Sequence, residues 1–411
     1  MIPIAKPCLG KQEIEAVSKV IESGWVTQGP KVLDFENEFC SKTGAQHACA
    51  VSNCTTALHL ALSVSGVKRG DYVITVSHSF IATANSVRHC GAEPLFVDID
   101  CDTFNISPEL LQQFLDNECL KKDGKTYFKN AGQNLPAESP LCGLPPEQIG
   151  RVAAIQVVHQ IGMPCDMARI MPIAEAYGIP VVEDAACAIG SEIYCPDTKS
   201  WKKIGDPIGN LACFSFHPRK VLTTGDGGMI TTNSIEEQEK LRLLRQHGMS
   251  VSDLARHKSS KFVQESYEVT GFNFRLTDIQ ASIGIEQLNR LDEIVSTRRR
   301  IADTYKEELR DISWLKTPVE PEYARTNWQS YAVTLADDAP YSRDQFIQAL
   351  MDKEILSKAG IMNAHVQPPY QDGKYNLPNS EKINKQSVLL PLFPQMSETE
   401  LASVIKTIKS L

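Results

Sequence analysis

The sequence predicts an α/β protein in which a mainly parallel seven-stranded sheet forms a large domain and a smaller α/β domain follows. Seven short apolar runs recur before residue 235, and helical patterns separate several of them. The runs are nearly continuous in apolar residues, which is typical of parallel strands that helices cover on both faces. The length of 411 residues is also too great for one ordinary core, so two domains are expected.

The strands are expected at 47–53, 72–76, 93–99, 152–158, 179–185, 211–217 and 228–233. Helical patterns lie between several of them, at 56–66, 81–91 and 167–178. The last two of these patterns close with glycine, the residue that most often follows the end of a helix. Strands 211–217 and 228–233 have no helix between them. We therefore expect these two strands to be neighbours joined by a tight connection, for which an antiparallel pairing is open.

The strand–helix alternation stops near residue 235, and a different pattern follows. Residues 277–312 give a long amphipathic helical pattern that begins with Thr277 as a capping residue. Shorter strand-like and helical runs near the C-terminus predict the smaller domain. We therefore assign a large domain to 1–250 and a smaller domain to 251–411. The polar segment at about 119–150, which holds four prolines, is expected to be an inserted surface excursion.

Composition and charge exclude several classes of function. Hydrophobic residues make up 42% of the chain and charged residues 22%, which is ordinary for a soluble globular protein. The net charge of -8 argues against binding to nucleic acids or anionic membranes, since those partners need a basic surface. No apolar run approaches the roughly 18 residues that cross a bilayer, and the first 17 residues lack a secretory hydrophobic core. A cytoplasmic protein is therefore expected.

The number and spacing of the cysteines indicate whether disulfides or a metal site are expected. In a cytoplasmic protein the 12 cysteines are expected to be reduced thiols. None of them forms a C-x-x-C pair, and the chain contains no H-E-x-x-H motif. No metal site is therefore expected.

One lysine lies in an unusual setting between two expected strands. Lys220 ends the segment "CFSFHPRK" and is followed by "VLTTGDGG", a loop too rich in glycine to be a helix. Glycines allow a ligand to come close to the backbone. A lysine in a pocket loses proton affinity and can attack a carbonyl carbon. A solvated loop lysine is the alternative that this motif alone leaves open.

An acid and an anion-binding segment precede this lysine. The segment "IPVVEDAACAIG" ends a strand in Glu183 and Asp184, whose side chains must face opposite ways, so only one can point into a site. The segment "VSNCTTALHLAL" places residues 53–56 at a strand-to-helix junction, where free N–H groups, hydroxyls and the helix dipole can bind an anion. A capping or solvated acid, and ordinary helix capping by Asn53 or Thr55, stay open.

A lysine, an acid and an anion-binding segment are together what pyridoxal phosphate requires. The lysine bonds to the aldehyde of this cofactor, the carboxylate pairs with its pyridine nitrogen, and the junction binds its phosphate. A nearby negative charge keeps the ring nitrogen protonated. The protonated ring then withdraws electrons from the Cα of a bound substrate.

Several motifs resemble, in order, those of the DegT/DnrJ/EryC1/StrS family, the sugar aminotransferases of fold type I among PLP-dependent transferases. The resemblance covers nearly the whole chain. Its segments are SGWVTQGPKVLDFENEF, NCTTALHLAL, SFIATANSV, HQIGMPCDM, EDAACAIGS, FSFHPRKVLTTGDGG and GFNFRLTDIQASIGIEQLNRLDE. Several independent motifs in the same order are far more specific than any one of them.

The resemblance implies roles for the matching positions. Lys220 would bond to the cofactor and later move a proton, and Asp184 would pair with the pyridine nitrogen. Asn273 would reach the phosphate from the partner subunit, which implies a homodimer with shared active sites. The remaining implied cofactor contacts are Cys54, Thr55 and Ser215 at the phosphate, Phe80 stacked on the ring, and Cys187. The implied substrate contacts are Arg275, His365 and Tyr370.

The sequence departs from the family pattern at two of these positions. Cys187 stands where the family usually has Gln, near the ring hydroxyl of the cofactor, so the tuning of the ring at this position is in doubt. Cys54 replaces a frequent Gly, which the main-chain contacts of this loop tolerate. Family members that dehydrate sugars carry histidine in place of the lysine, so Lys220 favours transamination.

The predicted activity is the transfer of an amino group from a donor, taken as L-glutamate, to a keto-sugar. The resemblance favours a nucleotide-linked keto-deoxyhexose in amino-sugar or surface-polysaccharide synthesis. A PLP-dependent sugar dehydratase and an aminotransferase of a free keto-sugar acid are alternatives within the family. A non-catalytic regulator of the same fold, and a nucleotide-binding α/β protein that uses "TTGDGG" as a phosphate loop, are alternatives outside it.

Overall fold

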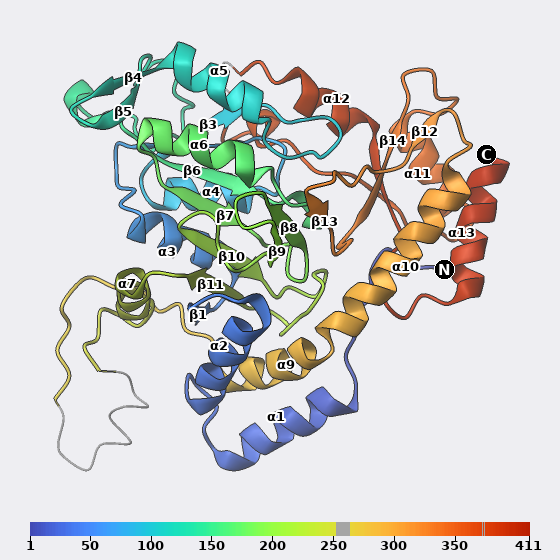
Figure 1. Ribbon diagram of the computed structural model, residues 1–411, viewed down its shortest axis with the longest axis horizontal. Helices are drawn as coiled ribbons and strands as arrows, with labels where there is room; N and C mark the ends of the chain where they lie inside the picture. The colour runs from blue at the N-terminus through green and yellow to red at the C-terminus, as the bar shows by residue number, and fades with distance from the viewer. Residues whose placement is uncertain (252–263, 372, 374) are drawn as a thin grey trace.

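The computed structural model describes residues 1–251, 264–371, 373 and 375–411. A seven-stranded sheet runs through the larger part of the molecule (Figure 1). Its strands, in spatial order, are β1 (His47–Val51), β11 (Gly228–Thr232), β10 (Leu211–Ser215), β7 (Val181–Asp184), β6 (Val152–Val158), β2 (Tyr72–Val76) and β3 (Glu93–Val97). β11 is antiparallel to both of its neighbours, and the remaining pairs are parallel. The predicted fold class is confirmed, and so is the pairing of β10 with β11.

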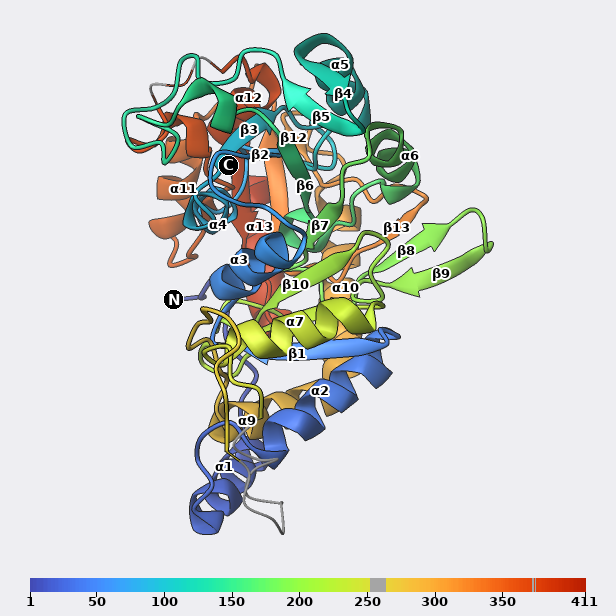
Figure 2. The ribbon, with the colours of Figure 1, turned by 90° about the vertical axis from the view of Figure 1, so that its left-hand side faces the viewer.

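Helices cover both faces of this sheet (Figure 2). One face carries α3 (Cys54–Val64), α4 (Ala82–His89) and α7 (Ile235–Arg245), and the other carries α2 (Pro30–Thr43), α5 (Pro108–Glu118) and α6 (Met167–Tyr177). Alternate side chains of one strand enter different cores. In β1, Cys49 and Val51 join the apolar cluster of α3, whereas Ala48 and Ala50 join that of α2. Burial on both faces explains why the strands read as continuous apolar runs.

The amphipathic pattern predicted over 277–312 forms two helices instead of one. α9 (Asp278–Asn289) begins after Thr277, which accepts the expected capping hydrogen bond, and packs against α2 and α1 (Lys11–Ser23). α10 (Leu291–Leu309) follows after a break at Arg290. The guanidinium of Arg290 donates to the carbonyl of Cys8 at 3.0 Å, so a contact with the N-terminal segment fixes the position of the break.

A second, four-stranded antiparallel sheet lies beside α10 (Figure 1). Its strands, in spatial order, are β12 (Leu315–Lys316), β14 (Tyr331–Leu335), β16 (Ser387–Leu390) and β15 (Lys358–Ala359), and its helices are α11 (Arg343–Met351), α12 (Pro378–Gln386) and α13 (Glu398–Ser410). The two cores meet along α10, because Ile294 and Val295 pack with the large sheet and Ile301 and Ala302 pack with the small one. A domain boundary at residue 250 stays a prediction, and residues 252–263 beside it lie outside the described ranges.

Three smaller features complete the chain. β4 (Cys119–Lys122) and β5 (Lys125–Phe128) form a hairpin in the segment predicted as an insertion. β8 (Glu192–Cys195) and β9 (Ser200–Lys203) form a projecting hairpin (Figure 2) that β13 (Ala324–Arg325) extends. The short helices are η1 (Pro146–Gln148), η2 (Gln160–Gly162) and η3 (Ala364–Val366). Within the described ranges, no helix is long and apolar enough to span a membrane.

A buried carboxylate joins α9 to the first turn of α2. Asp278 accepts the N–H groups of Gly29 at 2.7 Å and of Lys31 and Val32 at 3.0 Å each. The first N–H groups of a helix have no acceptor within the helix, and a negative charge there is also favoured by the helix dipole. A Cβ on Gly29 would lie 1.8 Å from the indole nitrogen of Trp25, so glycine is required for this close packing.

We expect Asp278→Ala to lower the free energy of unfolding by about 2–4 kcal/mol, because buried backbone donors lose their acceptor. The matched control is Asp34→Ala. Asp34 lies on α2 as well, but half-exposed and paired only with Lys31, so its loss should cost less than about 1 kcal/mol. Chemical denaturation of both variants measures the difference. Equal destabilisation by the two changes would contradict the capping role.

Candidate active site

Lys220 lies in the turn after β10, and its amine reaches the turn after β7. Its Nζ donates to the Sγ of Cys187 at 3.0 Å, and its backbone N–H donates to the carbonyl of His217 at 2.8 Å. Burial lowers the pKa of the amine, but the neighbouring Cys187, Cys54 and Asp184 more than offset this, so the pKa is raised. Lys220 is therefore not a freely solvated loop lysine, because it is partly buried and its amine contacts Cys187.

Asp184 ends β7 and is 4% exposed. One carboxylate oxygen accepts the hydroxyl of Thr83 at 2.8 Å, and the other accepts the N–H of Ala186 at 3.2 Å. Burial raises the pKa of this carboxyl, although these two hydrogen bonds and the nearby Lys220 act in the opposite direction. A buried carboxylate of this kind is stabilised by a cationic partner, such as a protonated ring nitrogen.

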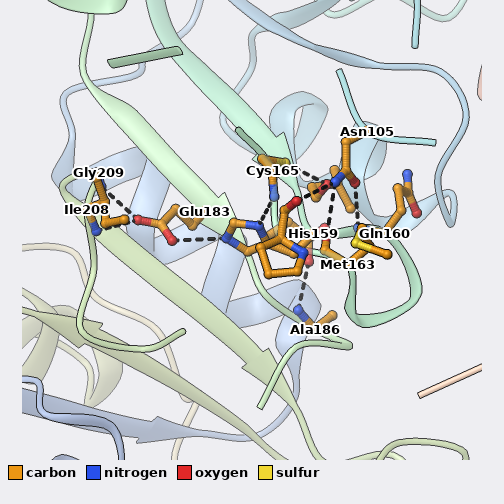
Figure 3. Close-up of polar contacts among 12 residues, drawn as sticks. Asn105, His159, Gln160, Met163, Cys165, Glu183, Ala186, Ile208 and Gly209 are labelled. Carbon is orange, nitrogen blue, oxygen red and sulfur yellow. Dashed lines mark hydrogen bonds and ion pairs between the residues drawn. The ribbon is translucent and has the colours of Figure 1, made fainter. Parts of the chain in front are cut away.

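Glu183 faces the other side of β7, and both of its carboxylate oxygens have hydrogen-bond partners inside the protein (Figure 3). One of its oxygens accepts the N–H groups of residues 208–209 at 2.8 and 2.7 Å, and the other lies 3.0 Å from Nε2 of His159. The N–H of Cys165 donates to Nδ1 of His159 at 3.0 Å, so Nε2 is the nitrogen that carries the proton and donates to Glu183. The predicted alternation is confirmed, and of this pair only Asp184 lies beside Lys220.

Three strand ends meet at the amino end of α3. Ser215, the last residue of β10, pairs with Gly228 of β11, and Gly228 in turn pairs with Val51 at the end of β1. A Cβ on Gly228 would lie 2.6 Å from the carbonyl of Asn53 and 2.9 Å from the nitrogen of Cys54. Glycine at this position therefore allows β11 to lie against the strand-to-helix junction.

The junction itself is capped and still presents hydrogen-bond donors. The side chain of Asn53 accepts the N–H of Thr56 at 2.9 Å, so the expected capping by Asn53 is confirmed. Cys54 and Thr55 are the first two residues of α3, and their N–H groups have no acceptor within the helix. Capping and anion binding are compatible here because they use different N–H groups.

These residues fit pyridoxal phosphate by the chemistry of their donor set. An amine, a buried carboxylate and a helix amino end with hydroxyl groups lie around the carboxyl ends of β1, β7 and β10, which is where open α/β sheets bind ligands. Phe80 lies on the same side of the sheet. Its carbonyl accepts the N–H of Thr83, which bonds to Asp184, and its ring is 64% exposed. Stacking of this ring on the cofactor stays a prediction.

Asn273 and Arg275 lie in an extended segment beside the end of β1. The N–H of Ser52 donates to the carbonyl of Phe274 at 2.8 Å, and Nε of Arg275 donates to the amide oxygen of Asn273 at 3.1 Å. Asn273 is exposed. The segment thus lies near the phosphate junction of its own chain, and contact with the cofactor of a partner subunit stays a prediction.

His365 and Tyr370 connect the C-terminal part of the chain to the large sheet. Nδ1 of His365 lies 2.6 Å from the hydroxyl of Ser77, and the hydroxyl of Tyr370 donates to Asn85 at 2.8 Å. The ring of Tyr370 also lies 3.8 Å from the guanidinium of Arg88. Both side chains are buried, at 7% and 1% exposure, and these contacts are packing contacts. Substrate binding by either residue stays a prediction.

Two residues near the site were missed by the sequence reasoning. Thr83 holds Asp184 in place, and it lies one helical turn after Phe80, a spacing that could have indicated it. Asn327 donates to the carbonyls of Cys187 and Ile189, at 2.8 Å each. No pattern in the sequence connects Asn327 to a turn that lies 140 residues earlier.

We also searched the described residues for a metal site and for a cavity. In the part of the chain that the structure describes, no group of three or more His, Cys, Asp or Glu side chains could hold a metal ion. A cavity of about 500 Å³ lies between α10 and the β8–β9 hairpin, and its lining contains none of the predicted site residues. The site is therefore identified by its side chains and not by this cavity.

Comparison with known families tests the resemblance. A model of the DegT/DnrJ/EryC1/StrS aminotransferase family matches residues 7–409. The chain belongs to this family. Family membership makes it a PLP-dependent aminotransferase, as the sequence predicted, and places it among the sugar aminotransferases.

Three relatives illustrate the likeness. The chain is 35% identical over 416 residues to the spore coat polysaccharide biosynthesis protein SpsC of Bacillus subtilis, with 100% of this chain and 97% of SpsC covered. The aminotransferase TlmJ from Streptoalloteichus hindustanus is 29% identical, with a TM-score of 0.81 and coverage of 100% of this chain and 98% of TlmJ. Helicobacter pylori PseC, an aminotransferase involved in pseudoaminic acid biosynthesis, is 25% identical, with a TM-score of 0.83 and both chains fully covered.

The two adjacent acids should respond differently to loss of charge. We expect Asp184→Asn to lower the rate of transamination by about 100-fold or more, since a preorganised charge contact is worth about 3 kcal/mol. Its thermal unfolding should change little. Glu183→Gln should instead lower stability by about 1–3 kcal/mol, because an amide cannot accept all of the hydrogen bonds that the carboxylate accepts. Steady-state rates and unfolding curves separate the two effects. If Glu183→Gln were stable but slow in transamination, and Asp184→Asn kept its activity, then Glu183 and not Asp184 would be the catalytic acid.

Proposed function

We propose that this enzyme transfers the amino group of L-glutamate to a keto-sugar, with a nucleotide-linked keto-deoxyhexose as the preferred acceptor, in amino-sugar or polysaccharide synthesis. The observation that carries the proposal is the partly buried Lys220, whose amine contacts Cys187 and feels the charge of Asp184, near a helix end that can bind an anion. SpsC and PseC, which are named for polysaccharide and pseudoaminic acid biosynthesis, support the class of acceptor. L-Glutamate is the donor that the family resemblance implies.

Each group of the site has a defined task in this reaction. Pyridoxal phosphate, when bound, supplies an electron-withdrawing ring conjugated to the Cα of the substrate. Asp184 would hold the proton on the ring nitrogen, and the amino end of α3 with Ser215 would bind the phosphate. Nζ of Lys220 would remove the proton from Cα of the amino donor and, in the second half of the reaction, return a proton to the sugar carbon.

A homodimer is part of the proposal, and exposed apolar side chains beside the site support it. Phe80 is 64% exposed and Val366 is 51% exposed. Their segments meet, because His365 contacts Ser77 by its backbone N–H at 3.0 Å as well as by its ring. Large apolar side chains that are exposed together are typical of an interaction surface. A second copy of the chain would cover them and bring Asn273 toward the neighbouring site.

Lys220 should be the residue to which the cofactor bonds. Borohydride reduction of the loaded protein should fix the cofactor to the peptide that contains Lys220, and mass spectrometry reads the position. Glutamate should give 2-oxoglutarate, and a panel of nucleotide-linked and free keto-sugars should identify the acceptor. Lys220→Ala should abolish both the adduct and 2-oxoglutarate formation, whereas Lys240→Ala, at an exposed position of α7, should leave both unchanged. An adduct on another lysine, or turnover without 2-oxoglutarate, would refute the proposal.

Subunit mixing should show whether sites are shared. Lys220→Ala and Asn273→Ala are each expected to be poorly active, the latter through loss of a charge-assisted hydrogen bond of about 1.5–3 kcal/mol. After exchange of subunits, one site of each mixed dimer would carry both changes and the other neither. Activity should then rise toward about a quarter of the wild-type value, because half of the dimers are mixed and half of their sites are intact.

As the control, each variant is mixed with itself, and its transamination activity should not rise. Exchange is verified by mass spectrometry of differently tagged subunits. No recovery after verified exchange, or a fully active monomer by light scattering, would show that Asn273 serves its own chain.

A further inference from the structure

Cys187 and Lys220 form a thiol–amine contact, and the proposed reaction uses Lys220 but gives no task to the thiol of Cys187. The two groups lie 3.0 Å apart, between residues that are 33 positions apart in the sequence. Both ends of the contact are held by the backbone. The carbonyl of Cys187 accepts the side-chain amide of Asn327, and the N–H of Lys220 closes a turn onto His217. The contact therefore joins two turns whose backbones are anchored.

Cys187 is also the cysteine of this site that solvent can reach. All twelve cysteines lie in the described ranges and are free thiols. Cys54, Cys165 and Cys213, which also lie near Asp184, are buried, whereas Cys187 is partly exposed. Oxidation of cysteines follows access of the oxidant to the sulfur. A small peroxide can thus reach Cys187 in preference to these buried cysteines.

We propose that Cys187 and Lys220 form a peroxide-sensitive switch, in which oxidation converts their contact into a covalent sulfur–nitrogen bond. A sulfenic acid condenses with a thiol to a disulfide or with a backbone nitrogen to a sulfenamide, and we extend this chemistry to a side-chain amine. The Lys220 amine is the nitrogen that the structure places beside the sulfur of Cys187. The bond needs only these two side chains and hydrogen peroxide, so the proposal goes beyond the aminotransferase activity and does not depend on the sugar.

The chemistry proceeds in two balanced steps. In the first step the sulfur attacks one oxygen of hydrogen peroxide and the O–O bond breaks. The sulfur is oxidised to a sulfenic acid, and the second oxygen leaves as water with the thiol proton. In the second step the Lys220 ammonium first gives one proton to solvent, and its Nζ then attacks the sulfur as the S–O bond breaks. The hydroxide leaves with a proton from the nitrogen, as a second molecule of water.

The cross-link would withdraw the nitrogen that the cofactor needs, and thiols would restore it. One external thiol attacks the sulfur, forms a mixed disulfide and releases the Lys220 amine. A second thiol releases the Cys187 thiol and leaves as a disulfide. The cofactor-free chain, in which the Lys220 amine is unoccupied, is the form in which peroxide should act.

Peptide mass spectrometry of the cofactor-free, full-length protein tests the proposal. After mild treatment with hydrogen peroxide, we expect the peptides of Cys187 and Lys220 to be joined, with a mass lower by two hydrogen atoms than their sum. Uptake of pyridoxal phosphate should fall in proportion to the joined fraction. Dithiothreitol should separate the peptides and restore the uptake.

Three variants act as controls. Cys142→Ser, which removes the exposed cysteine outside the site, should keep both the cross-link and its reversal. Cys187→Ser should form no cross-link, and its uptake of pyridoxal phosphate, whatever its starting level, should not respond to peroxide. In Lys220→Ala, Cys187 should stay a sulfenic acid that dimedone labels, which also shows that peroxide reaches the sulfur in a folded chain.

Other products would overturn the proposal. They are a disulfide between Cys187 and Cys54, a cross-link that retains an oxygen atom, and oxidation of Cys187 to a sulfinic acid without a cross-link. Loss of pyridoxal phosphate uptake in Cys187→Ser after peroxide treatment would equally show that another residue is responsible.

Discussion

The Glu183 carboxylate, anchored to His159 and to the backbone of residues 208–209, is the contact on which the geometry of the site depends. Successive side chains of a strand point to opposite faces, so holding Glu183 on one side of β7 holds Asp184 on the other. The hydroxyl of Thr83 then fixes the direction of the Asp184 carboxylate. Two acids that are adjacent in the sequence therefore have different roles. One is structural and has its hydrogen bonds satisfied, and the other keeps a buried charge beside Lys220.

The antiparallel strand β11 serves the same site by its position in the sheet. It lies between β1 and β10, which run in the same direction, so the ends of β1 and β10 come to the same edge with one strand between them. The absence of a side chain at Gly228 lets this strand lie directly on the junction before α3. Ser215 and the helix amino end can in this way act on one anion although more than 150 residues separate them in the sequence.

The sequence allowed the sheet and the alternation of Glu183 and Asp184 to be predicted from local periodicity, and the pairing of β10 with β11 from the absence of a helix between them. The antiparallel direction of that pair stayed open. Lys220 was singled out by its glycine-rich loop. The break at Arg290 could not be predicted, because it depends on a contact with Cys8 across the chain. The same holds for the contact of Cys187 with Lys220, which exists only once β7 and β10 are paired. His365 and Tyr370 were chosen by resemblance alone, and a linear sequence carries no information on their contacts with Ser77 and Asn85.

The continuity of the helix α10 limits how the two cores can move relative to each other. Its first half packs in the core of the large sheet and its second half in the core of the small one, without an intervening loop. Rotation of the small sheet against the large one would have to bend α10, which is a continuous hydrogen-bonded helix between the two cores. Movements that admit and release a sugar should thus be confined to surface segments around the site. Thermal unfolding of the core around the small sheet would also remove the packing of the second half of α10, so the two cores are expected to unfold in one cooperative transition.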